Sequence, residues 1–212
     1  MRIDSLAHYI VIVGVFCGSL TIAAVLASKI VSILGFFVPA GVFAYCITFV
    51  CTDVISEIWG KRYAQQAVVA GFVSLSIALV LSLVALYWTP APFWANQEGF
   101  ASVVGMTPRI VIGSLCAYLL SQYYDVWLFH LLKRMTKNKH LWLRNNLSTA
   151  ISQLLDSVVF IAIAFYGTMP IVPLIFGQWS VKLIIAVIDT PVVYGVVWSL
   201  RARQEESSEA VS

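Results

Sequence analysis

The chain has 212 residues, of which 60% are hydrophobic and only 11% are charged, with a formal net charge of +3. A water-soluble domain carries roughly twice that share of charged residues, so the composition excludes an ordinary soluble domain. The apolar residues are grouped in runs, each close to or above the roughly 20 residues that a helix needs to cross a bilayer. The sequence therefore predicts an all-α integral membrane protein.

Six such runs follow one another along the chain. Open sheet edges cannot face lipid, so each run is predicted to be a helix. The first run is too long for a removable signal peptide and shows no clear small-residue cleavage site, so we expect it to be retained. The predicted spans are Tyr9–Lys29, Phe36–Glu57, Gln65–Trp88, Arg109–Leu132, Leu147–Gly167 and Val172–Leu200. We expect one six-helix bundle over residues 1–203, followed by a disordered tail, 204–212, which is polar and acidic.

Lysine and arginine residues cluster in three short segments, after span two, between spans four and five, and after span six. Because cytoplasmic segments retain positive charge, all three segments and both termini are predicted to lie in the cytoplasm. The loop between Thr89 and Pro108 then faces outward. Basic residues that flank span ends without a continuous patch do not indicate nucleic-acid binding. The charge pattern thus predicts a multi-pass protein of the cytoplasmic (inner) membrane.

Ionisable side chains inside the predicted spans are the main functional signal, because one near a helix centre costs about 2.5–3.5 kcal/mol to insert. Such groups are tolerated where they face the bundle interior or a water-filled cavity. An excess of acids predicts a cationic or donor-rich solute, or a bound proton. We also expect the single deep lysine to neutralise a carboxylate of a neighbouring helix. These residues are Asp53, Glu57, Asp125, Asp156, Lys182 and Asp189.

Polar residues accompany two of these acids at helical spacing. Residues that recur at steps of three and four share one helix face, so two such faces predict a polar cavity between spans four and five. The alternative is interhelical hydrogen bonding that serves packing alone. For Asp53 and Glu57, an inner-rim salt bridge with Lys61 and Arg62 is the competing interpretation. The two stripes are Ser114, Tyr118, Gln122 and Asp125 on span four, and Asn145, Thr149, Ser152 and Asp156, flanked by Gln153, on span five.

Several short motifs occur in an order that resembles one family. They are Pro39-Ala40-Gly41, Thr52-Asp53 with Glu57 and Gly60-Lys61, Thr107-Pro108-Arg109, Ser121-Gln122 with Asp125, Ser152-Gln153 with Asp156, and Lys182 with Asp189-Thr190-Pro191. The ordered set, within residues 20–200, resembles the queuosine-precursor transporter family, also called the vitamin uptake transporter family. Ser28 and Ser157 depart from the pattern, which has Asn and Thr at these positions.

The resemblance implies uptake of a 7-deazaguanine base, such as a cyano or aminomethyl precursor or queuine, for tRNA modification. A carboxylate can accept the adjacent N–H and amino groups of a guanine-like edge, glutamine can pair with the carbonyl edge, and tyrosine can stack on the ring. The residues expected to bind the substrate are Tyr118, Gln122, Asp125, Gln153 and Asp156. Those expected to gate, couple or balance charge are Asp53, Glu57, Lys182 and Asp189. The implied partners are this solute and the lipid bilayer, with a homo-oligomer left open.

Two other functions remain open from the residues alone. A substrate-binding subunit of an energy-coupling-factor transporter is also a small helical bundle, and Ala23-xxx-Ala27 fits the small-residue face by which such subunits dock. An intramembrane enzyme has the weaker case, because the sequence contains no HExxH or GxSxG motif. The four cysteines lie within predicted spans without metal-ligand spacing, so we expect no disulfide framework, metal or cofactor.

Overall fold

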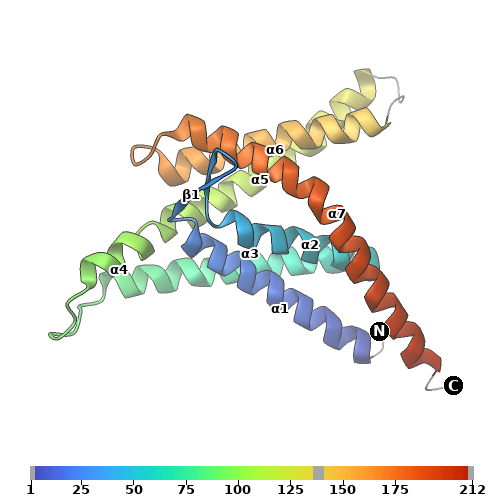
Figure 1. Ribbon diagram of the computed structural model, residues 1–212, viewed down its shortest axis with the longest axis horizontal. Coiled ribbons are helices and arrows are strands. Elements are labelled where there is room, and N and C mark those ends of the chain that lie inside the picture. Colours follow the sequence, from blue (N-terminus) through green and yellow to red (C-terminus); the bar gives the residue numbers. More distant parts are fainter. Residues whose placement is uncertain (1–2, 136–140, 210–212) are drawn as a thin grey trace.

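The computed structural model describes residues 3–135 and 141–209, and the side chains of Gln122, Asp125 and Asp189 lie outside this description. Helices α1, α2 and α3 pack on one another, α5 packs along α6, and α7 contacts α2, α6 and strand β2 (Figure 1). The elements are α1 (Ile3–Leu26), β1 (Ile30–Ile33), β2 (Phe36–Pro39), α2 (Val42–Trp59), α3 (Lys61–Tyr87), α4 (Gln97–Val104), α5 (Thr107–Met135), α6 (Leu141–Phe165) and α7 (Ile171–Glu209).

Four apolar stretches of the described helices are long enough to cross a membrane. They are Leu6–Leu26, Val42–Trp59, Lys61–Tyr87 and Gln97–Ser121, the last of which comprises α4 and the first half of α5. Two shorter apolar stretches, Ala150–Phe165 and Ile171–Ile185, lie in α6 and α7. The chain is therefore an all-α membrane protein, while the count of six spans stays a prediction.

The prediction that the second span begins at Phe36 is wrong. Helix α2 begins at Val42, and the residues before it form an antiparallel hairpin in which Ile30 pairs with Pro39. The hairpin turns at Gly35, whose φ of 85° is readily adopted by glycine. Its β-branched and aromatic residues favour a strand. The hairpin was missed because its apolar residues continue the run of α2, and hydropathy does not distinguish the two.

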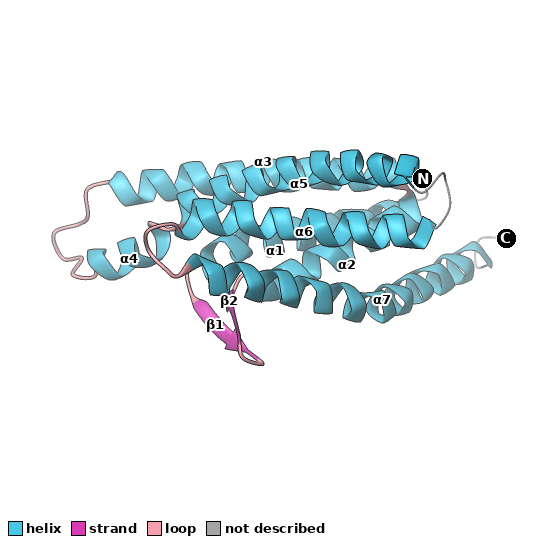
Figure 2. Ribbon diagram, turned by 90° about the horizontal axis from the view of Figure 1, so that it is seen from above, coloured by secondary structure: helices cyan, strands magenta, loops and turns pink. Residues whose placement is uncertain are grey.

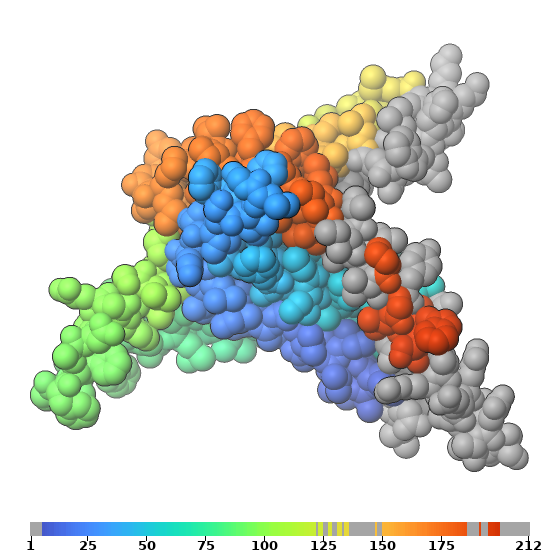
Figure 3. Space-filling model, in the orientation of Figure 1, coloured from blue at the N-terminus to red at the C-terminus, as the bar shows by residue number. Residues whose placement is uncertain are grey.

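The hairpin packs against the first part of α7, as the space-filling view shows (Figure 3). Val38 is fully buried there, in a cluster with Val42, Val181 and Ile185. At Gly177 the two backbones approach so closely that an added Cβ would meet the carbonyl oxygen of the facing strand. Glycine at this position therefore permits the hairpin to lie on the helix.

The two ends of the bundle differ in what they carry. Both termini, the α2–α3 junction and the end of α5 lie at one end, and α4 lies at the other (Figures 1 and 2). The basic segments therefore share one end, whose assignment to the cytoplasm stays a prediction. Helix α7 is described as far as Glu209, and the disorder that the sequence predicts for the tail 204–212 stays a prediction.

Small residues bring α5 and α6 together and set the position of the polar residues between them. Gly113, Ala117 and Ala164 are buried at this contact, and a Cβ added at Gly113 would lie 3.2 Å from a backbone oxygen of α6. Small residues allow such close helix approach in membranes. Arg109 donates from Nη2 to the carbonyl oxygen of Tyr166 at 2.9 Å, which ties the start of α5 to the end of α6.

Candidate functional site

A pocket of about 150 Å³ lies among α2, α5, α6 and α7, beside the base of the hairpin. Its wall combines hydrogen-bonding side chains with aromatic rings, which is the usual composition of a small-molecule site. The polar and charged lining residues are Ser114, Ser121, Gln153, Asp156, Gln178 and Lys182. The aromatic lining residues are Tyr45, Phe49, Tyr118 and Phe160.

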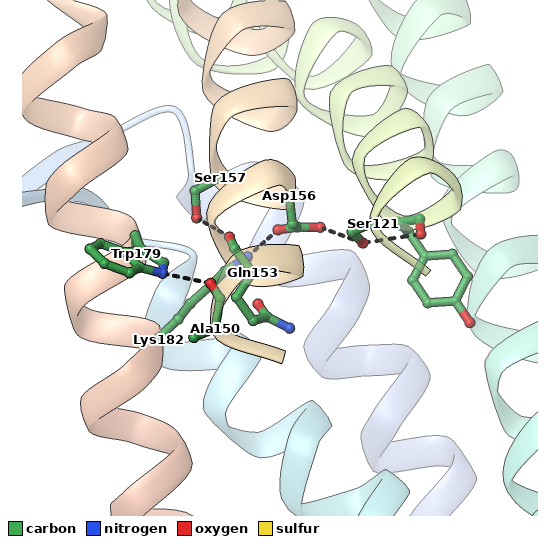
Figure 4. Close-up of polar contacts among 8 residues, drawn as sticks. Ser121, Ala150, Gln153, Asp156, Ser157, Trp179 and Lys182 are labelled. Atoms are coloured by element: carbon green, nitrogen blue, oxygen red, sulfur yellow. Dashed lines mark hydrogen bonds and ion pairs between the residues drawn. The ribbon is translucent and has the colours of Figure 1, made fainter. Parts of the chain in front are cut away.

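An ion pair crosses the pocket between α7 and α6. Lys182 Nζ contacts Asp156 Oδ2, and the two side chains are only 10% and 18% exposed. The Ser121 hydroxyl approaches Asp156 Oδ1 from α5 at 3.5 Å, but its 3.2 Å contact with the Tyr118 carbonyl is shorter (Figure 4). A hydroxyl has one hydrogen to donate, so the contact with Asp156 is weak. Oδ1 therefore retains capacity to accept a hydrogen bond from a ligand.

Two glutamine side chains bring unpaired acceptors to the same pocket. The amide oxygens of Gln153 and Gln178 are buried and have no hydrogen-bond donor among the described residues. A buried polar group left without a partner costs about 1–3 kcal/mol. Gln153 precedes Asp156 by three residues and Gln178 precedes Lys182 by four, so each helix presents an amide and a charge on one face.

Half of the aromatic lining residues come from α2. Tyr45 and Phe49 lie four residues apart, with ring centroids 6.3 Å apart and planes inclined by 48°. Tyr118 from α5 and Phe160 from α6 add further rings to the lining. Such rings offer apolar faces on which a flat ligand can stack.

The structure gathers only some of the predicted site residues. Tyr118, Gln153, Asp156 and Lys182 line the pocket, although Lys182 was grouped with the gating residues rather than with the binding residues. Asp53 and Glu57 are exposed on α2 and are not among its lining residues. Gln122, Asp125 and Asp189 have side chains outside the described residues. The binding and gating roles of all nine residues therefore stay predictions.

Several lining residues were not predicted as site residues from the sequence, among them Tyr45, Phe49 and Gln178. Tyr45 and Phe49 continue at four-residue steps into Asp53, a spacing that could have indicated them. Gln178 stands four residues before Lys182 on an otherwise apolar helix, and this spacing was its only signal. The structure adds all three to the candidate site.

Comparison with known proteins identifies the family of the chain that contains this pocket. Residues 39–196, more than half of the chain, match the model of a family described as "Putative vitamin uptake transporter". The chain belongs to this transporter family. The matched region contains every lining residue of the pocket except Ala27. Membership of a transporter family decides against the intramembrane enzyme considered from the sequence.

Curated relatives of the transporter come from three bacteria. Over 185 residues it is 32% identical to the "Probable queuosine precursor transporter" of Bacillus subtilis (strain 168), covering 85% of this chain and 81% of that protein. Over 137 residues it is 31% identical to the "Queuosine precursor transporter" of Escherichia coli (strain K12), covering 64% and 59% respectively. A third, the "Probable queuosine precursor transporter" of Haemophilus influenzae, is 27% identical over 176 residues, covering 77% and 70%. No solved structure matches the chain significantly.

Proposed function

We propose that this transporter imports a queuosine precursor, a 7-deazaguanine base, across the cytoplasmic membrane. The observation that carries the proposal is the pocket itself, which sets a carboxylate, an ammonium group and two amides among aromatic rings. The names of all three relatives, each called a queuosine precursor transporter or a probable one, support the substrate class.

The polar groups of the pocket complement a guanine-like base. Asp156 uses Oδ2 for Lys182, so Oδ1 can accept an N–H or amino hydrogen of the base. The Lys182 ammonium has three N–H donors, and those not directed at Asp156 can reach a ring carbonyl. Tyr45 and Tyr118 then provide ring faces for the flat solute. These contacts would recognise both the flat shape of the solute and its hydrogen-bonding pattern.

The size of the pocket favours a small flat solute. An engineered protein cavity of comparable volume holds a benzene ring. The observed volume of about 150 Å³ is therefore nearer to that of a base than to that of a nucleotide or a lipid. A bicyclic base is larger than benzene, so we expect the pocket to widen when the base binds.

For the membrane we propose six spans, with both termini, the α2–α3 junction and the end of α5 in the cytoplasm of the cell. Tyr45, Phe49, Asp53 and Glu57 follow one another at steps of four on α2, so they share one helix face. The two acids lie about 6 and 12 Å beyond Phe49 by helical rise, toward the end that carries the termini. We assign them to the cytoplasmic exit, as gating or coupling groups.

The alternative function, as a substrate-binding subunit of an energy-coupling-factor transporter, was based on the small-residue face at Ala23-xxx-Ala27, and the structure does not leave this face free for a partner. Ala23 and Ala27 are only 1% and 4% exposed. A Cβ added at Gly41 would lie 2.5 Å from the Ala23 carbonyl oxygen and 3.1 Å from the Ala27 Cβ. The small-residue face of α1 therefore packs inside this chain, and is covered rather than presented to a partner.

Uptake of labelled 7-cyano-7-deazaguanine into vesicles that contain only this protein tests the proposal. We expect saturable uptake that unlabelled 7-deazaguanine bases inhibit and that protein-free vesicles lack. Binding without uptake would favour an energy-coupling subunit. Failure of the protein to bind any 7-deazaguanine would refute the proposed substrate class.

A further inference from the structure

We propose that this pocket selects an uncharged 7-deazaguanine and discriminates against its aminomethyl, cationic analogue, with Gln153 and Gln178 accepting hydrogen bonds from N–H groups of the base. The inference rests on the proposed function and deepens it. It makes Gln178 a specificity-determining residue, and it assigns the Lys182–Asp156 pair the task of keeping the pocket electrically neutral.

The first step concerns the two amide oxygens. Gln178 is only 7% exposed, and its amide oxygen, like that of Gln153, has no donor within the described chain. Two donors of the same helices are engaged elsewhere, because Trp179 Nε1 donates to the Ala150 carbonyl at 3.0 Å and the Ser157 hydroxyl donates to the Gln153 backbone carbonyl at 2.9 Å (Figure 4). The amide oxygens can therefore gain their donors from a ligand.

The base has donors on opposite edges. A free 7-deazaguanine carries an N–H and an amino group on its pyrimidine ring and another N–H on its pyrrole ring. Gln153 lies on α6 and Gln178 on α7, so the two amide oxygens can serve different edges of a flat base held between these helices. Pairing relieves the cost of two buried acceptors, which gives these contacts more weight than exposed ones.

The second step concerns charge. Among the described side chains that line the pocket, Asp156 and Lys182 are the charged ones, and they neutralise each other. An aminomethyl cation would lose its hydration on entry without gaining a free carboxylate from the described lining residues. It would also lie near the ammonium of Lys182, and like charges repel strongly where the surroundings are apolar. A cyano group carries neither penalty.

The test compares two ligands on the full-length protein purified in detergent, 7-cyano-7-deazaguanine and 7-aminomethyl-7-deazaguanine. We expect the cyano compound to bind at least about tenfold more tightly than the aminomethyl compound. A tenfold loss of affinity for the aminomethyl compound corresponds to about one uncompensated charge interaction of modest size. Equal affinities, or tighter binding of the aminomethyl compound, would overturn the inference and leave the proposed function intact. If neither compound binds, it is the proposed function that fails.

Variants of Gln178 separate recognition from structural support. Gln178→Met keeps the length of the side chain and removes the acceptor, so affinity for the cyano compound should fall about 3- to 10-fold. The melting temperature of the ligand-free protein should stay constant or rise, because a buried unpaired oxygen is removed. Gln66→Met, at an exposed position of α3, is the matched control and should change neither quantity. Unchanged affinity of Gln178→Met would contradict the role of this residue.

Variants of the charges test the neutrality of the pocket. Lys182→Met leaves Asp156 unpaired. The ratio of the affinities for the cyano and aminomethyl compounds should therefore shift at least about tenfold in favour of the aminomethyl cation. Gln178→Glu adds an anion without breaking the ion pair and should shift the ratio in the same direction if Lys182→Met does not fold. Arg62→Gln removes an exposed cation outside the pocket and should leave the ratio unchanged. A ratio that neither pocket variant moves would refute selection by charge.

Discussion

The ion pair between α6 and α7 predicts a strong coupling between two substitutions. Asp156→Asn leaves the Lys182 ammonium, 10% exposed, without its carboxylate, and Lys182→Met leaves Asp156, 18% exposed, without its cation. Breaking a buried pair from one side costs about 3–5 kcal/mol, and the residual exposure places both variants near the lower end of that range. The double variant removes both charges, and replacing a whole buried pair is often nearly neutral. We therefore expect the double variant to be more stable than either single variant.

Unfolding of the ligand-free protein in detergent, followed by heat or denaturant, measures this double-mutant cycle. The interaction free energy between the two substitutions should be about 2 kcal/mol or more, and its sign should be opposite to that of the stability change caused by each substitution alone. Asp156→Asn combined with Arg62→Gln is the control, and its effects should add because Arg62 is exposed on another helix outside the pocket. Simple additivity of Asp156→Asn and Lys182→Met would refute the assignment of the pair as a stabilising contact.

Three further predictions follow from packing and topology. Gly177→Ala should lower the unfolding free energy by about 1–3 kcal/mol, because its Cβ meets a backbone oxygen of β2. Gly14→Ala is the control and should not destabilise the protein, because a Cβ added there has nothing within 4 Å. Equal melting temperatures of the two variants would contradict the close contact at Gly177. Arg109→Gln should cost about 1 kcal/mol of stability by removing the bond to the end of α6, and a wild-type melting temperature would show that this bond contributes nothing. Lys137→Cys, in a chain whose native cysteines are replaced, should resist an impermeant reagent applied to intact cells, and labelling from outside would reverse the predicted topology.

The sequence determined the membrane class and much of the chemistry of the site. The long apolar runs predicted helices, because a helix satisfies its own backbone hydrogen bonds in lipid, and all but the start of the second run follows this rule among the described residues. The cost of burying charge singled out Asp156 and Lys182, and it predicted that the lysine would neutralise a carboxylate of a neighbouring helix. The ordered motifs indicated the family, which the match over residues 39–196 confirmed.

Only the tertiary structure decided which of these groups meet. Asp156 pairs with Lys182 because α6 packs on α7, and no spacing within one helix encodes that contact. Gln178 belongs to no polar stripe on its own helix, so the sequence did not indicate it. It lines the same pocket as Gln153 only because α7 packs on α6. The hairpin before α2 was hidden in an apolar run, because hydropathy does not show that its two short strands pair with each other or that β2 contacts α7 at Gly177. Local hydropathy and periodicity report what each residue prefers, whereas a pocket forms only where separate elements are packed together.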